Sequence, residues 1–226
     1  MLRAKFVQTQ LPLELKELSS RMNRNQFNEE IGKGFVISSS NLNRLTGQYI
    51  EKFSQTSLVT DPFGNTTEVN SIAYFVCKFN WVFGSSLLTL IEPPRSIKKF
   101  VNALHDLTGL GLVVSEATVN IGSWLSRIED ATQLMTITKI NTSGITSSDY
   151  STARLSIVGS KDVRGPINEM LKDRDYIIDG ASFFATSDGL DFRCEISKTG
   201  SMKIASINAE RTLALLRESL ECTLLD

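Results

Sequence analysis

Four carboxylates and a lysine gather near the end of the chain: Asp179, Asp188, Asp191, Glu195 and Lys198. Metal-dependent nucleases place two carboxylates and a lysine on adjacent strands, where they bind Mg²⁺ and steady an attacking water. Asp191 and Glu195 are four residues apart, so their side chains would share one face of a strand. A metal-dependent nuclease or phosphodiesterase is therefore one hypothesis, with Asp179, Asp191, Glu195 and Lys198 as its catalytic residues.

The same carboxylates also have a plainer interpretation. Two residues separate Glu195 from Lys198, whereas the acid-x-Lys spacing typical of such nucleases has only one between them. Asp188-Gly189 is a favourable turn pair, because both residues tolerate a positive φ. Turn residues and the solvent face of a hairpin therefore account for the cluster, and the sequence favours this interpretation over a metal site.

A second group of candidates is basic and lies where two helices are predicted to begin: Arg95, Lys98, Lys99, Lys161 and Arg164. A cation in the first turn of a helix opposes the helix dipole. A bound phosphate would offset that cost, because the first backbone N–H groups of a helix are unsatisfied. We take these five residues as candidate nucleic-acid contacts, with an ordinary solvated helix surface as the alternative.

Motifs of the common enzyme classes are absent from the sequence. There is no G-x-x-x-x-G-K-[ST] loop, no G-x-G-x-x-G after a strand and no G-x-S-x-G elbow. His105 is the only histidine, so any histidine-containing catalytic triad would have to use it. A metal site with several histidines is excluded. We expect no cofactor and no metal, and an enzyme is the less favoured class.

Composition sets broad limits on the class of protein. The 226 residues are 41% hydrophobic and carry a net charge of −1, which provides no general attraction to nucleic acid or membrane. Neither a membrane-spanning apolar run nor a signal peptide is recognisable. Three scattered cysteines, Cys77, Cys194 and Cys222, fit small buried hydrophobes in a reducing compartment. We expect a cytoplasmic protein without membrane contact.

The clearest local signal is a turn at Asp61-Pro-Phe-Gly-Asn65, with extended sequence on both sides. Apolar residues alternate with others after the turn: Ala73, Phe75, Cys77, Phe79, Trp81 and Phe83. A period of two predicts a strand, so this pattern indicates a long hairpin with the aromatic face in the core. Stacking of nucleic-acid bases on these rings is the less favoured alternative.

Residues 88–119 and 155–183 repeat a strand–helix–strand pattern. Ser96 and Asp162, the predicted helix caps, are offset by 66 residues, and apolar positions align after them. We interpret the two segments as a duplicated half-domain, in which Lys98 and Arg164 occupy equivalent positions.

The remaining elements complete the expected fold. Helices are predicted at Pro12–Met22, around Trp124 and from Asn208 to the end, where leucines form one stripe. Further strands are predicted at Leu134–Ile140 and in a hairpin across 190–205, with a flexible loop at 141–149. This order predicts an α+β fold, with mostly antiparallel sheet and a few packed helices around the two related units. The expected segments are 1–60, 61–140 and 150–226.

These observations favour binding over catalysis. The leading hypothesis is a non-enzymatic intracellular adaptor, a subunit of a larger protein or protein–nucleic acid assembly. A protein is its expected partner and nucleic acid a second ligand. The nuclease remains the alternative.

Overall fold

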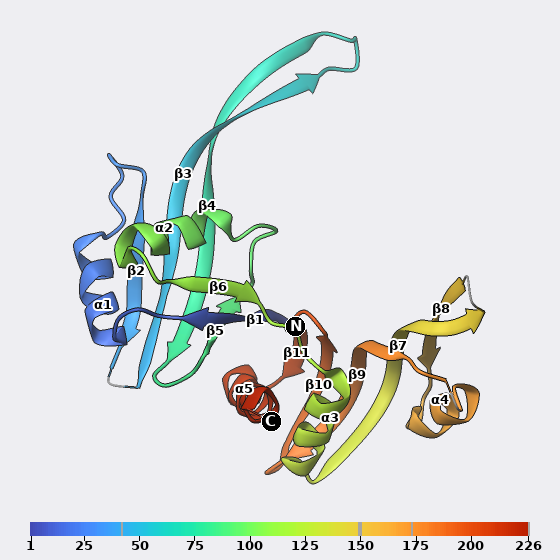
Figure 1. Cartoon of the computed structure of the whole chain (residues 1–226). Helices are drawn as coiled ribbons and strands as arrows, with labels where there is room; N and C mark the ends of the chain where they lie inside the picture. Colours follow the sequence, from blue (N-terminus) through green and yellow to red (C-terminus); the bar gives the residue numbers. More distant parts are fainter. Residues whose placement is uncertain (42, 149–150, 173, 226) are drawn as a thin grey trace. The chain divides into compact units, whose positions relative to one another are not determined.

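The computed structural model describes residues 1–41, 43–148, 151–172 and 174–225 of the chain (Figure 1). Roughly 25% of the chain is helix and 50% strand, and the sheet is mostly antiparallel, which confirms the predicted α+β class. The chain divides into two compact units: unit 1 holds residues 1–8 and 115–226, and unit 2 holds residues 9–114. The expected segments 1–60, 61–140 and 150–226 have other boundaries than these two units and stay a prediction. Their boundary at 60/61 falls at a hairpin turn, where Thr60 pairs with Thr66.

Unit 2 contains a meander of antiparallel strands that follow one another in the chain. They are β2 (Lys33–Ser40), β3 (Arg44–Thr60), β4 (Thr66–Val82) and β5 (Leu87–Ile91). Two helices, α1 (Leu15–Arg24) and α2 (Lys98–Thr108), pack against this meander. Phe100 of α2 stacks on Phe79 of β4 with ring centroids 5.4 Å apart. Helix α1 confirms the helix predicted at Pro12–Met22, although it begins and ends slightly later, at Leu15 and Arg24.

The predicted aromatic face of β4 is only partly buried. Cys77, Phe79 and Trp81 are buried, as expected for a strand with one face in the core. Phe75 is half-buried, because it lies where the hairpin begins to leave the core. Phe83 is 62% exposed, which contradicts its predicted place in the core. It follows the last residue of β4, so the period of two no longer applies to it.

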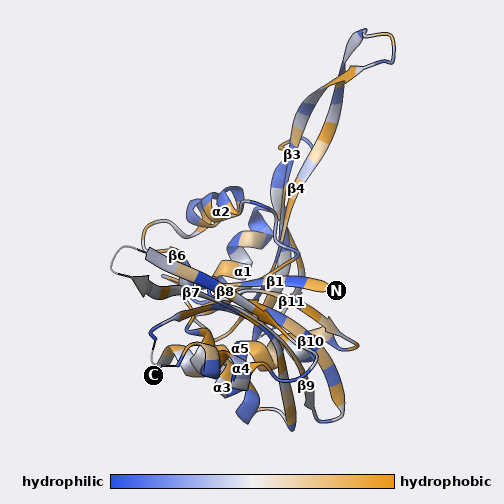
Figure 2. Ribbon diagram, turned by 90° about the vertical axis from the view of Figure 1, so that its right-hand side faces the viewer, coloured by the Kyte–Doolittle hydropathy of each residue, from blue (hydrophilic) through white to orange (hydrophobic). Residues whose placement is uncertain are grey.

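Unit 1 contains the other antiparallel strands. In spatial order they are the first residues of β1 (Leu2–Gln10), β11 (Ser201–Ser206), β10 (Leu190–Ser197), β9 (Ile177–Ser187), β7 (Leu134–Ser148) and β8 (Ser151–Val158). The short strand β6 (Val113–Glu116) joins the two units in the chain. Three helices lie on one side of the unit 1 sheet (Figure 2): α3 (Ile121–Asp130), α4 (Arg164–Met170) and α5 (Ala209–Leu225).

The core of unit 1 forms around Trp124 of α3. Its ring lies 6.3 Å from that of Phe6, and its indole Nε1 donates a 3.1 Å hydrogen bond to the carbonyl of Leu216. The leucine stripe of α5, Leu213, Leu216 and Leu220, is buried as predicted. Because Trp124 has a partner for its N–H, the ring can be fully buried without leaving a polar group unsatisfied.

The predicted loop at 141–149 is wrong over most of its length. Residues 141–148 continue β7 and pair with β8, whereas residue 149 lies outside the described residues. Asn, Ser, Thr and Gly are typical of loops, yet Thr142 and Ile145 are buried here. The pairing with β8 shifts register between these two residues, so a β-bulge accommodates Gly144 at a φ of +70°.

The two segments of the proposed repeat share local features. Lys98 and Arg164 are the first helical residues of α2 and α4, and their N–H groups donate to the side chains of Ser96 and Asp162. The helices differ in length, with 11 residues in α2 and 7 in α4. The duplication itself stays a prediction.

Candidate binding sites

The four carboxylates of the predicted acidic cluster do not share a common ligand site. Each carboxylate accepts from a different side chain: Asp179 from Lys198 at 2.6 Å, Asp188 from Arg211 at 2.6 Å, Asp191 from Thr186 at 2.7 Å and Glu195 from Lys203 at 3.0 Å. Asp191 and Glu195 alternate outward on β10 as predicted, but their partners lie on different neighbouring strands. In the described part of the chain, no three His, Cys, Asp or Glu side chains are grouped so that they could hold a metal ion.

Lys198 and Asp179 meet next to the β10–β11 turn. Their hydrogen bond is the main reason why the pKa of Asp179 lies below its usual range, and a second one from Ser143 adds to it. An ionised aspartate beside an ammonium group is a stable ion pair. This contact explains both residues without a metal ion.

The predicted basic residues are divided between the two units, so they form no common site within either. Arg95 and Lys98 are exposed at the start of α2, and Lys161 is exposed before α4. Lys99 is engaged by unit 2, because its Nζ donates to Glu51 at 2.7 Å and lies 4.7 Å from the centroid of the Phe53 ring. Such a cation–π contact combined with an ion pair stabilises the base of the hairpin.

Arg164, the first residue of α4, binds the end of α3 and the loop before α4. Its guanidinium donates to both carboxylate oxygens of Glu129, at 2.9 and 2.7 Å, and to Asp162. These bonds raise the pKa of Arg164, with Asp162 as the larger cause. Partial burial favours a higher pKa for Asp162, but hydrogen bonds from Arg164 and from the N–H of Ile137 outweigh it and lower the pKa. The donors of Arg164 therefore bind protein carboxylates, which accounts for the residue without a phosphate.

Two cysteines behave as predicted and the third does not. Cys77 and Cys194 are buried and free, and desolvation raises both thiol pKa values, that of Cys77 to about 12. Such thiols stay protonated and unreactive at neutral pH. Cys222 is exposed on α5, so the expectation that all three are buried is wrong.

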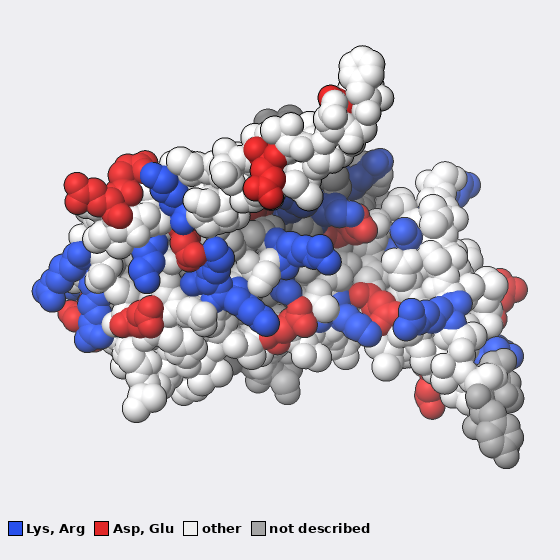
Figure 3. Space-filling model, turned by 90° about the horizontal axis from the view of Figure 1, so that it is seen from above, with Lys and Arg blue, Asp and Glu red and all other residues white. Residues whose placement is uncertain are grey.

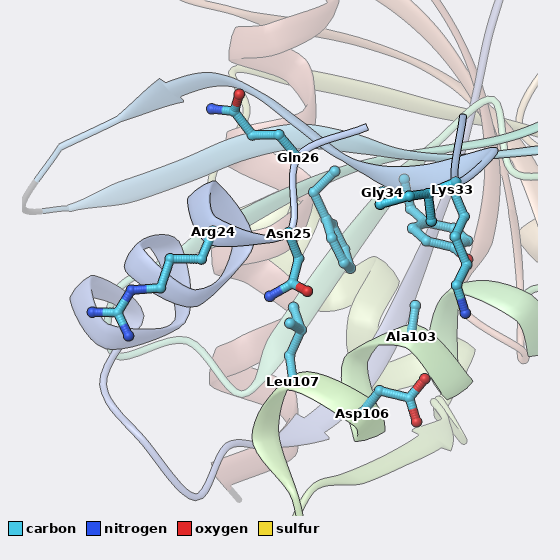
Figure 4. Close-up of a pocket in the computed structure, with 11 residues that line it drawn as sticks. Arg24, Asn25, Gln26, Lys33, Gly34, Ala103, Asp106 and Leu107 are labelled. Atoms are coloured by element: carbon cyan, nitrogen blue, oxygen red, sulfur yellow. The ribbon is translucent and has the colours of Figure 1, made fainter. Parts of the chain in front are cut away.

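A small pocket lies within unit 2 between α1, α2 and the β2–β3 pair (Figure 4). Its volume is about 190 Å³, below the roughly 300–1,000 Å³ of typical ligand pockets. In Figure 4 the side chain of Arg24 points away from the other labelled residues, while Asn25 and Leu107 face each other. The polar groups at this pocket do not converge on one point.

Tyr49 forms the buried wall of this pocket. Its hydroxyl donates to Glu51 at 3.1 Å, and desolvation together with this carboxylate raises the pKa of Tyr49 to about 12. The phenol therefore stays neutral at pH 7 and cannot serve as a base. We assign the pocket a structural role.

A more distinctive surface is the far part of the β3–β4 hairpin, which extends away from the rest of its unit (Figure 1). We call residues 54–72 the arm. Every residue of the arm except Ser57 is exposed. The turn at its tip has the predicted chemistry, since Gly64 has a φ of +87° and Asp61 accepts from the N–H groups of Phe63 and Asn65.

Exposed apolar residues are interspersed with polar ones along the arm, whose ribbon has both hydrophobic and hydrophilic segments in Figure 2. The large apolar side chains that are at least 45% exposed are Leu58, Val59, Phe63, Val69 and Ile72. The strand alternation places Leu58 and Ile72 on one face of the ribbon and Val59 and Val69 on the other. The sequence predicted the hairpin but not its extension, because a period of two does not reveal where the supporting helices end.

The second distinctive surface is the face of the unit 1 sheet that the helices of unit 1 do not cover, which we call the uncovered face. It carries a groove of about 540 Å³, lined by Lys139, Ser182, Phe184, Arg193 and Glu195 among others. Of these residues the sequence singled out Glu195 alone, as a carboxylate of the acidic cluster, although Arg193 and Glu195 alternate with buried Phe192 and Cys194 along β10. Charges on the face seen in Figure 3 are mixed in sign. Local groups rather than a general field must therefore select a ligand.

No family model matches the chain, and no curated protein is significantly similar to it in sequence. Among the described helices, none has both the length and the apolar character that a bilayer crossing requires.

Proposed function

We propose that this chain is a non-enzymatic binding subunit of a larger assembly, and that the arm docks on a protein partner. The observation that carries the proposal is the apolar surface on both faces of the arm. Several large apolar side chains exposed on one projecting element are typical of a binding surface. A two-stranded ribbon is also marginally stable alone, so a partner that covers it would stabilise it.

The charge of the arm favours a protein over nucleic acid. No Lys or Arg occurs between Lys52 and Lys78, and the arm carries the carboxylates of Asp61 and Glu68. Phosphate backbones are bound mainly through Lys and Arg, so the arm offers them no attraction. Aromatic residues such as Phe63 are instead enriched at the core of protein interfaces.

The test is a shortened arm. Replacing residues 54–72 with Asn-Gly joins Phe53 to Ala73, which already face each other across the hairpin, through a two-residue turn. We expect the melting temperature to stay unchanged, because the arm buries little surface. Photo-crosslinking through a reactive residue at position 72, in the native host, should identify a partner that the shortened protein no longer co-purifies.

The matched control is Phe83→Ser, which removes an exposed aromatic side chain outside the arm. This variant should retain the partner. If the shortened protein retains the same partner with wild-type yield, the arm is not the docking element and the proposal is wrong.

A further inference from the structure

The uncovered face of the unit 1 sheet presents side chains in two rows that run across the strands. The first row is set by direct register pairs and contains Arg3, Lys203, Glu195, Ser182, Lys139 and Val158. The second row contains Arg193, Phe184 and Thr136. Helices α3, α4 and α5 lie on the opposite side of the sheet (Figure 2). Because residues in register point to the same side of a sheet, these two rows form one surface.

Arg193 and Phe184 form a stacked pair at the groove. The guanidinium carbon lies 4.1 Å from the centroid of the Phe184 ring, and Phe184 is still 43% exposed. An Arg plane held on an aromatic ring offers its outer side to another planar group. Unpaired bases stack on aromatic rings and on Arg guanidinium planes, so the pair is a platform of that type.

The charges around the platform are mostly positive. Lys139 lines the groove with Arg193, and Lys203 lies in the first row. Glu195 is the carboxylate that lines the groove, and Lys203 neutralises it at 3.0 Å. Arg154 of β8 extends this surface, since it alternates to the same side as Val158. Two further carboxylates lie near this surface: Asp191, on the same face of β10 as Arg193, accepts from Thr186, and Asp179 interacts electrostatically with Arg154. Lys139 and Arg193 at the groove therefore provide the attraction for an anion, next to an aromatic ring.

We propose that single-stranded nucleic acid binds along this face, with a base stacked on the Arg193–Phe184 platform and a phosphate near Lys139. The volume of the groove, about 540 Å³, lies within the range of ligand sites. A duplex fits less well, because its bases are already stacked on one another and cannot reach the platform. This site is separate from the arm and goes beyond the proposed function.

Fluorescence anisotropy with labelled 12-nucleotide dT and U oligomers, over a series of salt concentrations, tests the proposal. Phe184→Ala should weaken binding about fivefold to 150-fold, the usual loss for one stacked base. Lys139→Gln should lower the slope of log K against log salt by about 0.7, the value for one phosphate contact on a single strand. Arg193→Lys keeps the charge but loses the plane, so affinity should fall while the slope stays constant.

Lys172→Gln is the matched control, because it removes one exposed cation beside α4, outside the two rows. It should leave affinity and slope unchanged. The shortened arm should also bind oligomers like wild type, which separates this proposal from the proposed function. Comparison of the dT and U oligomers identifies whether DNA or RNA is preferred, and melting temperatures verify that each variant is folded.

Several results would overturn the proposal. These are no measurable binding of wild-type protein at low salt, equal affinity for a duplex of the same sequence, or wild-type affinity in both Phe184→Ala and Arg193→Lys. Full competition by poly-glutamate at equal charge would show a surface that binds any polyanion, and would also reject the stacked base.

Discussion

At the scale of single residues, ion pairs within the protein engage several side chains that the sequence suggested as ligand-binding or catalytic residues. Arg164 is the clearest example, since its guanidinium joins Glu129 at the end of α3 to Asp162 before α4. Asp162 is a neighbour of Arg164 in the sequence, but Glu129 is 35 residues away and is brought to Arg164 by the packing of α3 and α4, so residue type and position alone could not reveal this contact.

Arg164→Gln should destabilise the protein by about 1–2 kcal/mol, because hydrogen bonds to charged groups are lost from a partly exposed site. Urea unfolding measures the change in the free energy of unfolding. Lys172→Gln serves as the control and should leave it within about 0.5 kcal/mol of wild type. An equal, small effect of both substitutions would contradict the structural role of Arg164.

Glu51 predicts a dependence of stability on pH. Its hydrogen bond from Lys99, and a further one from Tyr49, lower its pKa in the folded protein. The unfolded value is about 4.3, so the stabilisation is present above that pH and is lost as the pH falls through the lower folded value.

Glu51→Gln should therefore reduce stability at pH 6, by under about 1 kcal/mol, and have less effect at pH 3. Thermal melts at the two pH values measure the difference. Glu68→Gln, on the exposed arm, controls for the loss of any carboxylate. If Glu51→Gln shifted the melting temperature equally at both pH values, the ion pair with Lys99 would not be its cause.

At the scale of elements, the turn between β9 and β10 shows how backbone conformation restricts residue choice. Asp188 and Gly189 have φ values of 47° and 73°, as a two-residue type I′ turn requires. Gln133 accepts from the N–H of Asp188 at 2.8 Å and so holds the turn. The sequence identified this pair as a turn, and the structure confirms it.

Gly189→Ala should cost about 1 kcal/mol, because a side chain at positive φ is strained even though no atom lies within 4 Å of the new Cβ. Gly189→Asn should cost less, since Asn tolerates this conformation. Chemical unfolding of the two variants compares them. Equal losses would indicate that contacts of the side chain, not the backbone angle, determine the effect.

At the scale of the whole molecule, two units each have their own core. Trp81 is 1% exposed in unit 2, and Trp124 fills the core of unit 1.

Trp81→Ala should destabilise the protein by about 3–5 kcal/mol through the cavity that it leaves. Calorimetry measures this loss. Phe83→Ala, which truncates an exposed ring two residues away, should cost much less. Similar losses would contradict the difference in burial.

The class of fold and most of its elements follow from local patterns in the sequence. The turn at Asp61–Asn65, the alternation from Cys77 to Trp81 and the leucine stripe of α5 are local patterns, and each appears where it was expected. Such patterns suffice because turn chemistry and periodicity act over a few neighbouring residues. Element boundaries and the continuation of β7 across 141–148 were missed, since strand pairing overrode a composition typical of loops.

Which side chains contact each other depends on how the elements pack in three dimensions. Arg164 and Glu129 are 35 residues apart, and their contact depends on how two helices pack. The arm is recognised in the structure because no other element covers Leu58 and Ile72. The Arg193–Phe184 platform is formed by the register in which β9 pairs with β10. Contacts between distant segments are not encoded in any local pattern, because they arise from the packing of complete elements. For this reason the candidate surfaces could be identified only in the structure, whereas the strands and helices that carry them could be predicted from the sequence.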